Sequence, residues 1–407
     1  MQTPIPAHIR IIYDGIGSSV FPGQVLAPLK TYQKESSTTS VYIVSFEYAR
    51  DYKAAYTLIE KKFSGMLLEK AHVQHTIFAS TNNTNKNCPP ISFILFKKYP
   101  FIGSLNLSLA AYQLKKFLRQ LPSYTISARG PIAGAIAVRA AHTQRCQELV
   151  IQARGLVAAE YAYDQEQKNH KKKPWGKLRA WIHHLRAQQF EKLEKKVYAL
   201  RTQLPATIEC VSPALKTYLI QTFHAPAVKI TIAQHDIPPL FTREQLETWK
   251  KEVRRELAIP EKASVYCYSG SVKPWQCPDL TIDFFARQLQ NNPENYLLIL
   301  TQEKDQFEKL LAQSSIAPKN YRIFTVAHDQ VYRYLAACDM GILFRRPHVV
   351  NWVSRPTKAL EYRAAGLAIA HNNTVAYLQD QSDLSKNMTT PCFSSNNFWS
   401  THPKMAP

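Results

Sequence analysis

The sequence predicts an α/β protein with two domains, each built on a parallel β-sheet covered by helices. The chain has 407 residues, which exceeds one ordinary domain of about 100–200 residues. Hydrophobic residues make up 45% of the chain and charged residues 20%, so a sizeable core can form. Short β-rich runs alternate with helical stretches through both halves, which is typical of parallel strands joined by crossover helices.

The first half of the chain predicts an open, doubly wound sheet. Apolar runs predict strands at 9–13, 41–46, 73–78, 91–96, 124–127 and 149–152. Helical patterns lie at 105–119 and 134–141, and a helix-compatible segment separates the first two strands.

The second half repeats this alternation more clearly and predicts a Rossmann-like domain. Strands are expected at 265–270, 296–302, 321–327, 340–344 and 367–371. Helices are expected between them at 280–289, 303–311, 330–337 and 357–365. Apolar strands separated by helices in this order are typical of a doubly wound sheet.

The crossing between the two domains is expected near residue 212. A short apolar run at 208–211 ends there, and three prolines lie between residues 225 and 240. We therefore expect an N-terminal domain at 1–212 and a C-terminal domain at 213–385. The chain is rich in Ser and Asn after Asp380, so an irregular tail is expected over 386–407.

The net charge of +21 implies an anionic partner. Residues 168–201 hold eleven Lys/Arg and two Glu, a local net charge of +9, and their apolar residues recur at helical spacing. Such an amphipathic basic helix is either a solvated surface helix or a contact with anionic lipid. Nucleic acid is disfavoured as the partner because aromatic residues are not interleaved with the basic run as stacking platforms.

The compartment is expected to be the cytoplasm, with peripheral contact at the inner face of the membrane. No signal-like segment opens the sequence, and no run of about 18 apolar residues occurs in it. The seven cysteines lack any CxxC pair, so neither a disulfide framework nor a zinc site is expected.

Two segments follow strands of the second half and hold residues suited to phosphate. In open parallel sheets, ligands collect at the carboxyl ends of the strands. Gly270, Ser271 and Lys273 follow the first strand, where small residues let a phosphate approach the backbone and Lys supplies charge. A plain strand-to-helix turn is the alternative interpretation.

The segment after the fourth strand is more specific. Thr357 is expected to cap a helix, Lys358 lies in its first turn, and Glu361 follows on the same face. Residues 268–371, with their Gly-rich turn, a Lys and a "PTK…EY.AAG" pattern, resemble the donor-binding domain of glycosyltransferase family 4. Residues 208–215 resemble the family's interdomain strand and turn, and residues 235–237 with Phe241 resemble its linker. Residues 127–131, and residues 153–155 with Glu160, resemble N-terminal motifs of its bacterial members.

This resemblance implies the GT-B fold, in which the parallel sheets of two Rossmann-like domains face a central cleft. It implies that Glu361 binds the ribose of a nucleotide-sugar, and that Lys273 with Arg345 or Arg346 binds its diphosphate. The family's first glutamate is replaced by Val353, for which Asn351 or Ser354 could substitute. The donor-binding residues expected on these grounds are Gly270, Ser271, Lys273, Arg345, Arg346, Asn351, Ser354, Thr357, Lys358 and Glu361.

The first half is expected to supply the acceptor side of the cleft. Gly15, Gly17 and Ser18 follow the first strand, where family members have a flexible glycine loop. Arg129 and Arg154 each end a predicted strand and are expected on one side of the sheet, and both could instead be surface charges or form interdomain ion pairs. Glu160 completes the expected acceptor-side residues.

The resemblance implies a retaining glycosyltransferase that moves a sugar from a nucleotide-sugar donor to a saccharide or lipid-linked acceptor of the bacterial cell envelope. No DxD pair occurs in the sequence, so a metal-independent site without a cofactor is expected. The spacing identifies no catalytic base. The alternatives are a non-catalytic GT-B-like scaffold that binds sugar or nucleotide, and a nucleotide-sugar epimerase.

Overall fold

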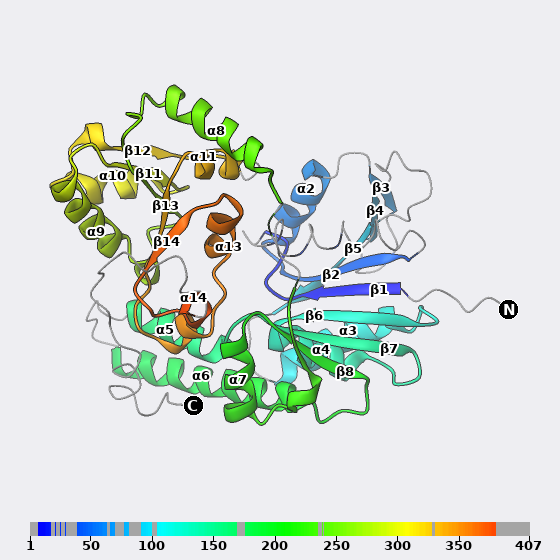
Figure 1. The fold of residues 1–407 in the computed structure, drawn as a ribbon. Helices are drawn as coiled ribbons and strands as arrows, with labels where there is room; N and C mark the ends of the chain where they lie inside the picture. Colours follow the sequence, from blue (N-terminus) through cyan, green and yellow to red (C-terminus); the bar gives the residue numbers. More distant parts are fainter. Residues whose placement is uncertain are drawn as a thin grey trace. The chain divides into compact units, whose positions relative to one another are not determined.

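The computed structural model describes residues 7–17, 21, 25, 29, 39–62, 66–69, 77–80, 91–99, 104–168, 176–234, 238, 240–327 and 330–379. The chain forms two compact units, unit 1 up to Asp236 and unit 2 from Ile237. Each unit has its own sheet (Figure 1).

Unit 1 contains a nine-stranded sheet in the order β3-β4-β5-β2-β1-β6-β7-β8-β9. In this spatial order, the seven strands β5, β2, β1, β6, β7, β8 and β9 are parallel to one another. Strand β4 pairs antiparallel with β5, and β3 pairs antiparallel with β4. The strands are β1 Ala7–Ile12, β2 Val41–Tyr48, β3 Met66–Glu69, β4 Ile77–Ser80, β5 Ile91–Lys98, β6 Tyr124–Arg129, β7 Cys146–Ala153, β8 Ala206–Cys210 and β9 Ile230–Ile232.

The helices of unit 1 cover the sheet through small and apolar residues. Ala55 and Ile59 of α2 pack on a cluster that includes Val41 and Ile43 of β2. Helix α4 packs on β6 and β7 and contacts α3 and α6. The helices are α2 Tyr52–Lys62, α3 Ser104–Leu118, α4 Gly130–Ala140, α5 Val157–Lys168, α6 Gly176–Tyr198 and α7 Pro213–Phe223.

Unit 2 contains a five-stranded, fully parallel sheet in the order β12-β11-β10-β13-β14. Two apolar clusters lie on its two faces, because alternate residues such as Cys267 and Tyr268 belong to different clusters. The strands are β10 Val265–Ser269, β11 Tyr296–Leu300, β12 Tyr321–Phe324, β13 Met340–Leu343 and β14 Ala368–His371. The helices are α8 Arg243–Glu256, α9 Pro278–Asn291, α10 Lys304–Ala312, α11 Val331–Ala336, α12 Val349–Trp352, α13 Thr357–Ala364 and α14 Ala376–Gln379.

These elements confirm the expected α/β class of two Rossmann-like units. All five strands predicted for the second half are present. In the first half, the strand predicted at 73–78 is seen only from Ile77, in the antiparallel strand β4, and 70–76 lie outside the described residues. The tail expected at 386–407 also lies outside them.

The division between the units falls later than the expected residue 212. Strand β9 pairs in parallel with β8, with Ile230 opposite Ile208. Helix α7 connects these two strands and begins where the Ser212 hydroxyl accepts a hydrogen bond from Leu215 N at 3.0 Å. Residues 206–232 therefore form one β-α-β crossover on the first sheet.

The basic segment 168–201 contains α6, which has two different halves. Phe190, Leu193 and Val197 in the second half are buried. Trp181 and Ile182 in the first half are 58% and 44% exposed, so the single apolar stripe expected from the spacing is divided between core and surface. Residues 169–175 lie outside the described part of the chain. Among the described helices, none has the length and apolar character needed to cross a bilayer.

Candidate functional site

The strand order of unit 2 places two loops side by side. Strand β10 pairs with β11 on one side and with β13 on the other, so the direction of winding reverses between β10 and β13. Ligands of open α/β sheets bind beyond the carboxyl ends of the strands at such a switch point. The turn after β10 and the loop after β13 meet at this point.

Gly270 lets a lysine approach the turn after β10. Its φ is +149°, and a Cβ at this position would lie 2.6 Å from Gln276 Oε1 and 2.8 Å from Lys358 Nζ. Any side chain here would displace those groups. The Ser271 carbonyl accepts a hydrogen bond from the Tyr268 hydroxyl at 2.7 Å, which holds the turn against its own strand.

Tyr362 fixes helix α13 to both strands of the switch point. Its hydroxyl accepts a hydrogen bond from Ser269 N at 2.9 Å and donates to the Ile342 carbonyl at 3.4 Å. Its ring packs on Gly341, where a Cβ would overlap the ring. The turn near Gly270 and the helix that begins at Thr357 are therefore held together.

Lys358 is the buried cation of this arrangement. It is 8% exposed, its Nζ donates to Gln276 Oε1 at 2.8 Å, and it lies 4.4 Å from the centre of the Tyr268 ring. Burial, followed by repulsion from Arg345, lowers the pKa of Lys358 well below its ordinary value, while Glu361 acts in the opposite direction. A buried ammonium with an uncharged hydrogen-bond partner is well placed to receive an anion.

The two arginines after β13 have different environments. Arg345 is 7% exposed, and Asn372 holds its backbone through bonds of 3.2 Å to its N–H and 2.7 Å to its carbonyl. Arg346 is exposed and lies 2.7 Å from the Asp279 carboxylate. Of the two, Arg345 is the arginine whose charge acts on Lys358.

Lys273 and Glu361 lie at the margin of this cluster. Lys273 is exposed, and its Nζ lies 5.0 Å from the centre of the Trp275 ring. Glu361 is half-buried, and its negative charge partly offsets the lowering of the Lys358 pKa. Burial, together with the charge of Glu361, raises the pKa of Tyr332 to about 12.

The remaining predicted residues of this loop have structural hydrogen bonds. Asn351 donates to the Arg346 carbonyl at 2.8 Å, and the Ser354 hydroxyl donates to the Asn351 carbonyl at 2.7 Å. Thr357 was expected to cap α13, but the N-cap is Pro356 without a side-chain bond, because Thr357 is already the first helical residue. Val353 is 1% exposed, so position 353 belongs to the core.

Unit 1 has a similar switch point between β1 and β6, since β1 pairs with β2 on its other side. After β1, Gly15 has a φ of +88°, and a Cβ there would lie 2.7 Å from Glu47 Oε2. Across the switch point, Arg129 Nε lies 3.9 Å from Asp14 Oδ2, and the Arg129 side chain is 9% exposed. Gly17 follows in the same turn, and the predicted Ser18 lies outside the described residues.

Arg154 and Glu160 lie one strand further along the sheet. Arg129 pairs with Gln152 of β7, and Arg154 directly follows the last residue of that strand. The Glu160 carboxylate lies directly over Gly155, where a Cβ would overlap it. Asp14 and Arg129 both act on the charge of Glu160, so these predicted residues belong to one edge of unit 1.

Sequence reasoning missed four residues of these two edges. Gln276 and Tyr268 contact Lys358 in unit 2. Glu47 of β2 accepts a bond from Ile16 N at 2.8 Å, and Lys98 of β5 donates to the Tyr13 carbonyl at 2.5 Å. Charged residues at the end of otherwise apolar strands could have indicated Glu47 and Lys98, whereas nothing local marks Gln276.

Neither metal ligands nor disulfides are found within the described ranges. No three His, Cys, Asp or Glu side chains gather there as metal ligands would. The five cysteines of these ranges are buried and free.

Comparison with solved structures shows which fold this is. The chain is similar to a glycosyltransferase from Rickettsia africae, with 10% identity, a TM-score of 0.56 and coverage of 94% of this chain and 83% of that one. It is also similar to WaaG, a glycosyltransferase involved in lipopolysaccharide biosynthesis (14% identity, TM-score 0.54, coverage 92% and 84%). The catalytic domain of starch synthase IV from Arabidopsis thaliana is a third neighbour (13% identity, TM-score 0.56, coverage 95% and 87%).

These neighbours are glycosyltransferases of the GT-B class, and the chain has the GT-B fold. By sequence, no family model matches the chain. No curated protein is significantly similar to it by sequence.

Proposed function

We propose that the protein is a glycosyltransferase that takes a sugar from a nucleotide-sugar donor, and that its donor diphosphate binds at the switch point of unit 2. The observation that carries this proposal is the buried pair Arg345 and Lys358, beside the Gly270 turn. Two buried cations at the carboxyl ends of parallel strands match the charge and the usual position of a bound phosphate.

The chemistry follows from where negative charge develops. When the bond between the sugar and the β-phosphate breaks, the nucleoside diphosphate departs with additional negative charge on that phosphate. Arg345 and Lys358 stabilise this charge in a site with little water, where electrostatic interactions are strong. By the resemblance to family 4, Glu361, one helical turn after Lys358, accepts hydrogen bonds from the ribose hydroxyls in this proposal.

The finer proposals rest on the resemblance to glycosyltransferase family 4. They are retention of the anomeric configuration, a metal-independent reaction, and an acceptor site at Gly15, Arg129, Arg154 and Glu160 of unit 1. Val353 is in the core, and Asn351 and Ser354 bond within their own loop. Contacts to the donor sugar therefore come from other residues.

The nucleotide part of the proposal is tested by thermal stabilisation with UDP-, GDP- and ADP-sugars, since a ligand of the native state raises its apparent stability. Glu361→Ala should weaken binding of the stabilising nucleotide by roughly tenfold, the value of one charge-assisted hydrogen bond. The control Glu261→Ala removes an exposed carboxylate elsewhere in unit 2. Equal affinity of the two variants would contradict the ribose assignment.

Transfer itself is tested by nucleotide release after addition of acceptors. Release that depends on the acceptor supports a transferase. Binding without release supports the non-catalytic scaffold, and an altered sugar still attached to nucleotide supports the epimerase.

A lipid-linked acceptor and peripheral contact with the inner face of an anionic membrane are part of this proposal. The first half of α6 exposes Trp181, Ile182 and Leu185, and Lys177 and Arg186 belong to the same half. Apolar and basic residues on one helix favour an anionic lipid surface. Trp181→Ala should reduce sedimentation with phosphatidylglycerol vesicles, and the control Trp249→Ala should not.

A further inference from the structure

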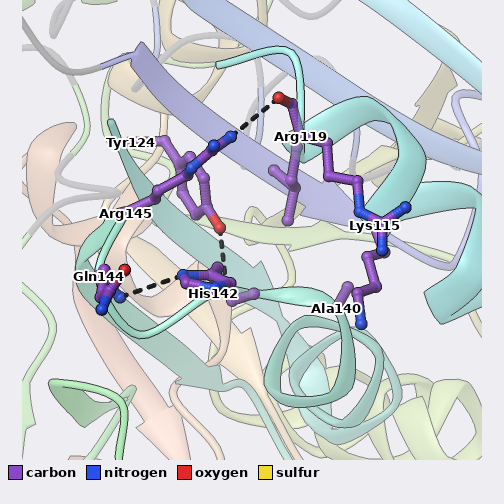
Figure 2. Close-up of a pocket in the computed structure, with 9 residues that line it drawn as sticks. Lys115, Arg119, Tyr124, Ala140, His142, Gln144 and Arg145 are labelled. Carbon is purple, nitrogen blue, oxygen red and sulfur yellow. Dashed lines mark hydrogen bonds between the residues drawn. The ribbon is translucent and has the colours of Figure 1, made fainter. Parts of the chain in front are cut away.

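A basic pocket of about 630 Å³ lies in unit 1, away from the strand ends that hold the predicted acceptor-side residues. It lies at the amino-terminal ends of β6 and β7, between the last turns of α3 and α4 (Figure 2). Its lining residues are Lys115, Leu118, Arg119, Tyr124, Ala140, Ala141, His142, Gln144 and Arg145.

The lining has positive charge that no lining carboxylate compensates. Lys115, Arg119 and Arg145 give a formal charge of +3, and the lining contains no Asp or Glu. The carboxyl ends of α3 and α4 each add a partial charge of about −0.5. The pocket therefore has a net charge of roughly +2.

Hydrogen bonds fix two of the donor groups in place. Arg145 Nη1 donates to the carbonyls of Arg119 at 2.9 Å and Leu121 at 3.4 Å. His142 N donates to the Tyr124 hydroxyl at 2.9 Å, and Gln144 N donates to His142 Nδ1 at 3.3 Å (Figure 2). Because Nδ1 accepts a bond, the neutral His142 ring has its proton on Nε2 and can donate it to a ligand.

We propose that this pocket binds a phosphate monoester. Such a group has a charge of about −1.5 to −2 at neutral pH, which matches the pocket, whereas a carboxylate would leave about one positive charge uncompensated. Leu118, Ala140 and Ala141 add apolar surface to the lining, which suits an organic ester. The pocket is a second binding site, independent of the proposed nucleotide-sugar site.

The test measures binding of glycerol 3-phosphate by calorimetry. The double variant Lys115→Ala/Arg119→Ala should weaken binding by roughly tenfold or more, because each cation makes charge-assisted hydrogen bonds. The matched control Lys116→Ala/Arg139→Ala removes the same charge from exposed positions of α3 and α4 outside the pocket. This control should change the affinity less than twofold.

Two further measurements separate the possible outcomes. The double variant Lys115→Ala/Arg119→Ala should bind the nucleoside diphosphate as tightly as the unaltered protein does, so the nucleotide-sugar proposal is tested separately. Binding to phosphatidylcholine vesicles with and without phosphatidic acid shows whether the pocket also binds a phosphate monoester that belongs to a lipid. In that case the pocket variant loses binding to the vesicles with phosphatidic acid, and the control variant does not. Equal loss in both double variants, or no binding of either phosphate form by the unaltered protein, would overturn the proposal.

Discussion

Replacement of Lys358 by methionine separates a binding role from a structural one. Lys358 is 8% exposed and its Nζ donates to the uncharged amide of Gln276 at 2.8 Å. A buried lysine that stabilises the fold is expected to pair with a carboxylate. A buried lysine that binds an anionic ligand lowers the stability of the free protein, and this cost is removed when the ligand binds. We therefore expect Lys358→Met to raise the stability of the free protein and to weaken nucleotide binding.

The size of both effects follows from this environment. Replacing a buried charge by an apolar residue of similar volume gains about 1–4 kcal/mol, and loss of the bond to Gln276 costs about 1 kcal/mol. The net gain of about 0–3 kcal/mol corresponds to a Tm increase of up to roughly 12 °C for a unit of this size. Loss of a charged hydrogen bond to the diphosphate costs about 1.5–3 kcal/mol, or roughly 10- to 150-fold in Kd.

The pH dependence gives a second measure of the same group. The pKa of Lys358 is lowered in the folded protein, so between the folded and unfolded values the unfolded chain binds more protons. The stability cost of Lys358 is full below the folded pKa and declines as pH rises toward the unfolded value of about 10.4. The stability difference between Lys358→Met and the unaltered protein should therefore shrink with rising pH.

Differential scanning calorimetry measures the Tm of each variant, and titration calorimetry measures the Kd of the nucleoside diphosphate. Lys319→Met is the control, because Lys319 is exposed on unit 2. If Lys358→Met lowers the Tm and leaves the Kd unchanged, Lys358 is a structural donor to Gln276 and the proposed diphosphate site is refuted.

Three further predictions concern the same unit. Gly270→Ala should lower both the Tm and the affinity for nucleotide, because the new Cβ would lie 2.8 Å from Lys358 Nζ. Scanning and titration calorimetry measure these two quantities. If neither the Tm nor the Kd changes, the close approach of Lys358 to Gly270 is contradicted. Nucleotide Kd should rise with pH, because the bound anion favours protonated Lys358, and Lys358→Arg should flatten this profile because arginine stays charged. Asp339→Asn should lose about 1–2 kcal/mol of stability at pH 7, discounted for partial exposure. Partial burial by itself would raise the pKa of Asp339. The net pKa is lowered, because the carboxylate accepts hydrogen bonds from Lys250 and Val265 N and lies near the charge of Arg254. Its contribution is therefore lost as pH falls through this lowered value, and urea unfolding below pH 3.9 should show the two proteins converging.

Much of the fold could be predicted because buried parallel strands are nearly continuous apolar runs. The run Tyr296–Leu300 is buried at every position, and the sequence identified it directly. Strand β9 was missed because Ile230–Ile232 has only three residues, too few for periodicity. The division near residue 212 was misplaced because Ser212 and Pro213 indicate a turn, and only the pairing of β9 with β8 shows that the chain returns to the same sheet.

The sequence offers the residue types of the candidate site, but it does not indicate which of these side chains are buried. Lys273 and Lys358 are equally plausible phosphate ligands in sequence, yet Lys273 is exposed and Lys358 is buried. This difference depends on the pairing of β10 with β13, two strands separated by about 70 residues, which no local pattern encodes. The same holds for Arg345 and Arg346, adjacent residues with different exposure.

Both units nevertheless follow one rule at their switch points. In each, a glycine with positive φ follows the first strand, Gly15 in unit 1 and Gly270 in unit 2. In each, an arginine with a buried side chain lies at the end of the strand across the switch point: Arg129 is the last residue of β6, and Arg345 follows β13. A glycine turn beside a buried arginine leaves backbone N–H groups and a positive charge on one side of the sheet, which is an environment for anions. In unit 1 the Asp14 carboxylate lies 3.9 Å from this arginine, whereas in unit 2 the charge of Arg345 acts on a second buried basic residue, Lys358. A diphosphate at the proposed donor site would add negative charge beside both residues of unit 2.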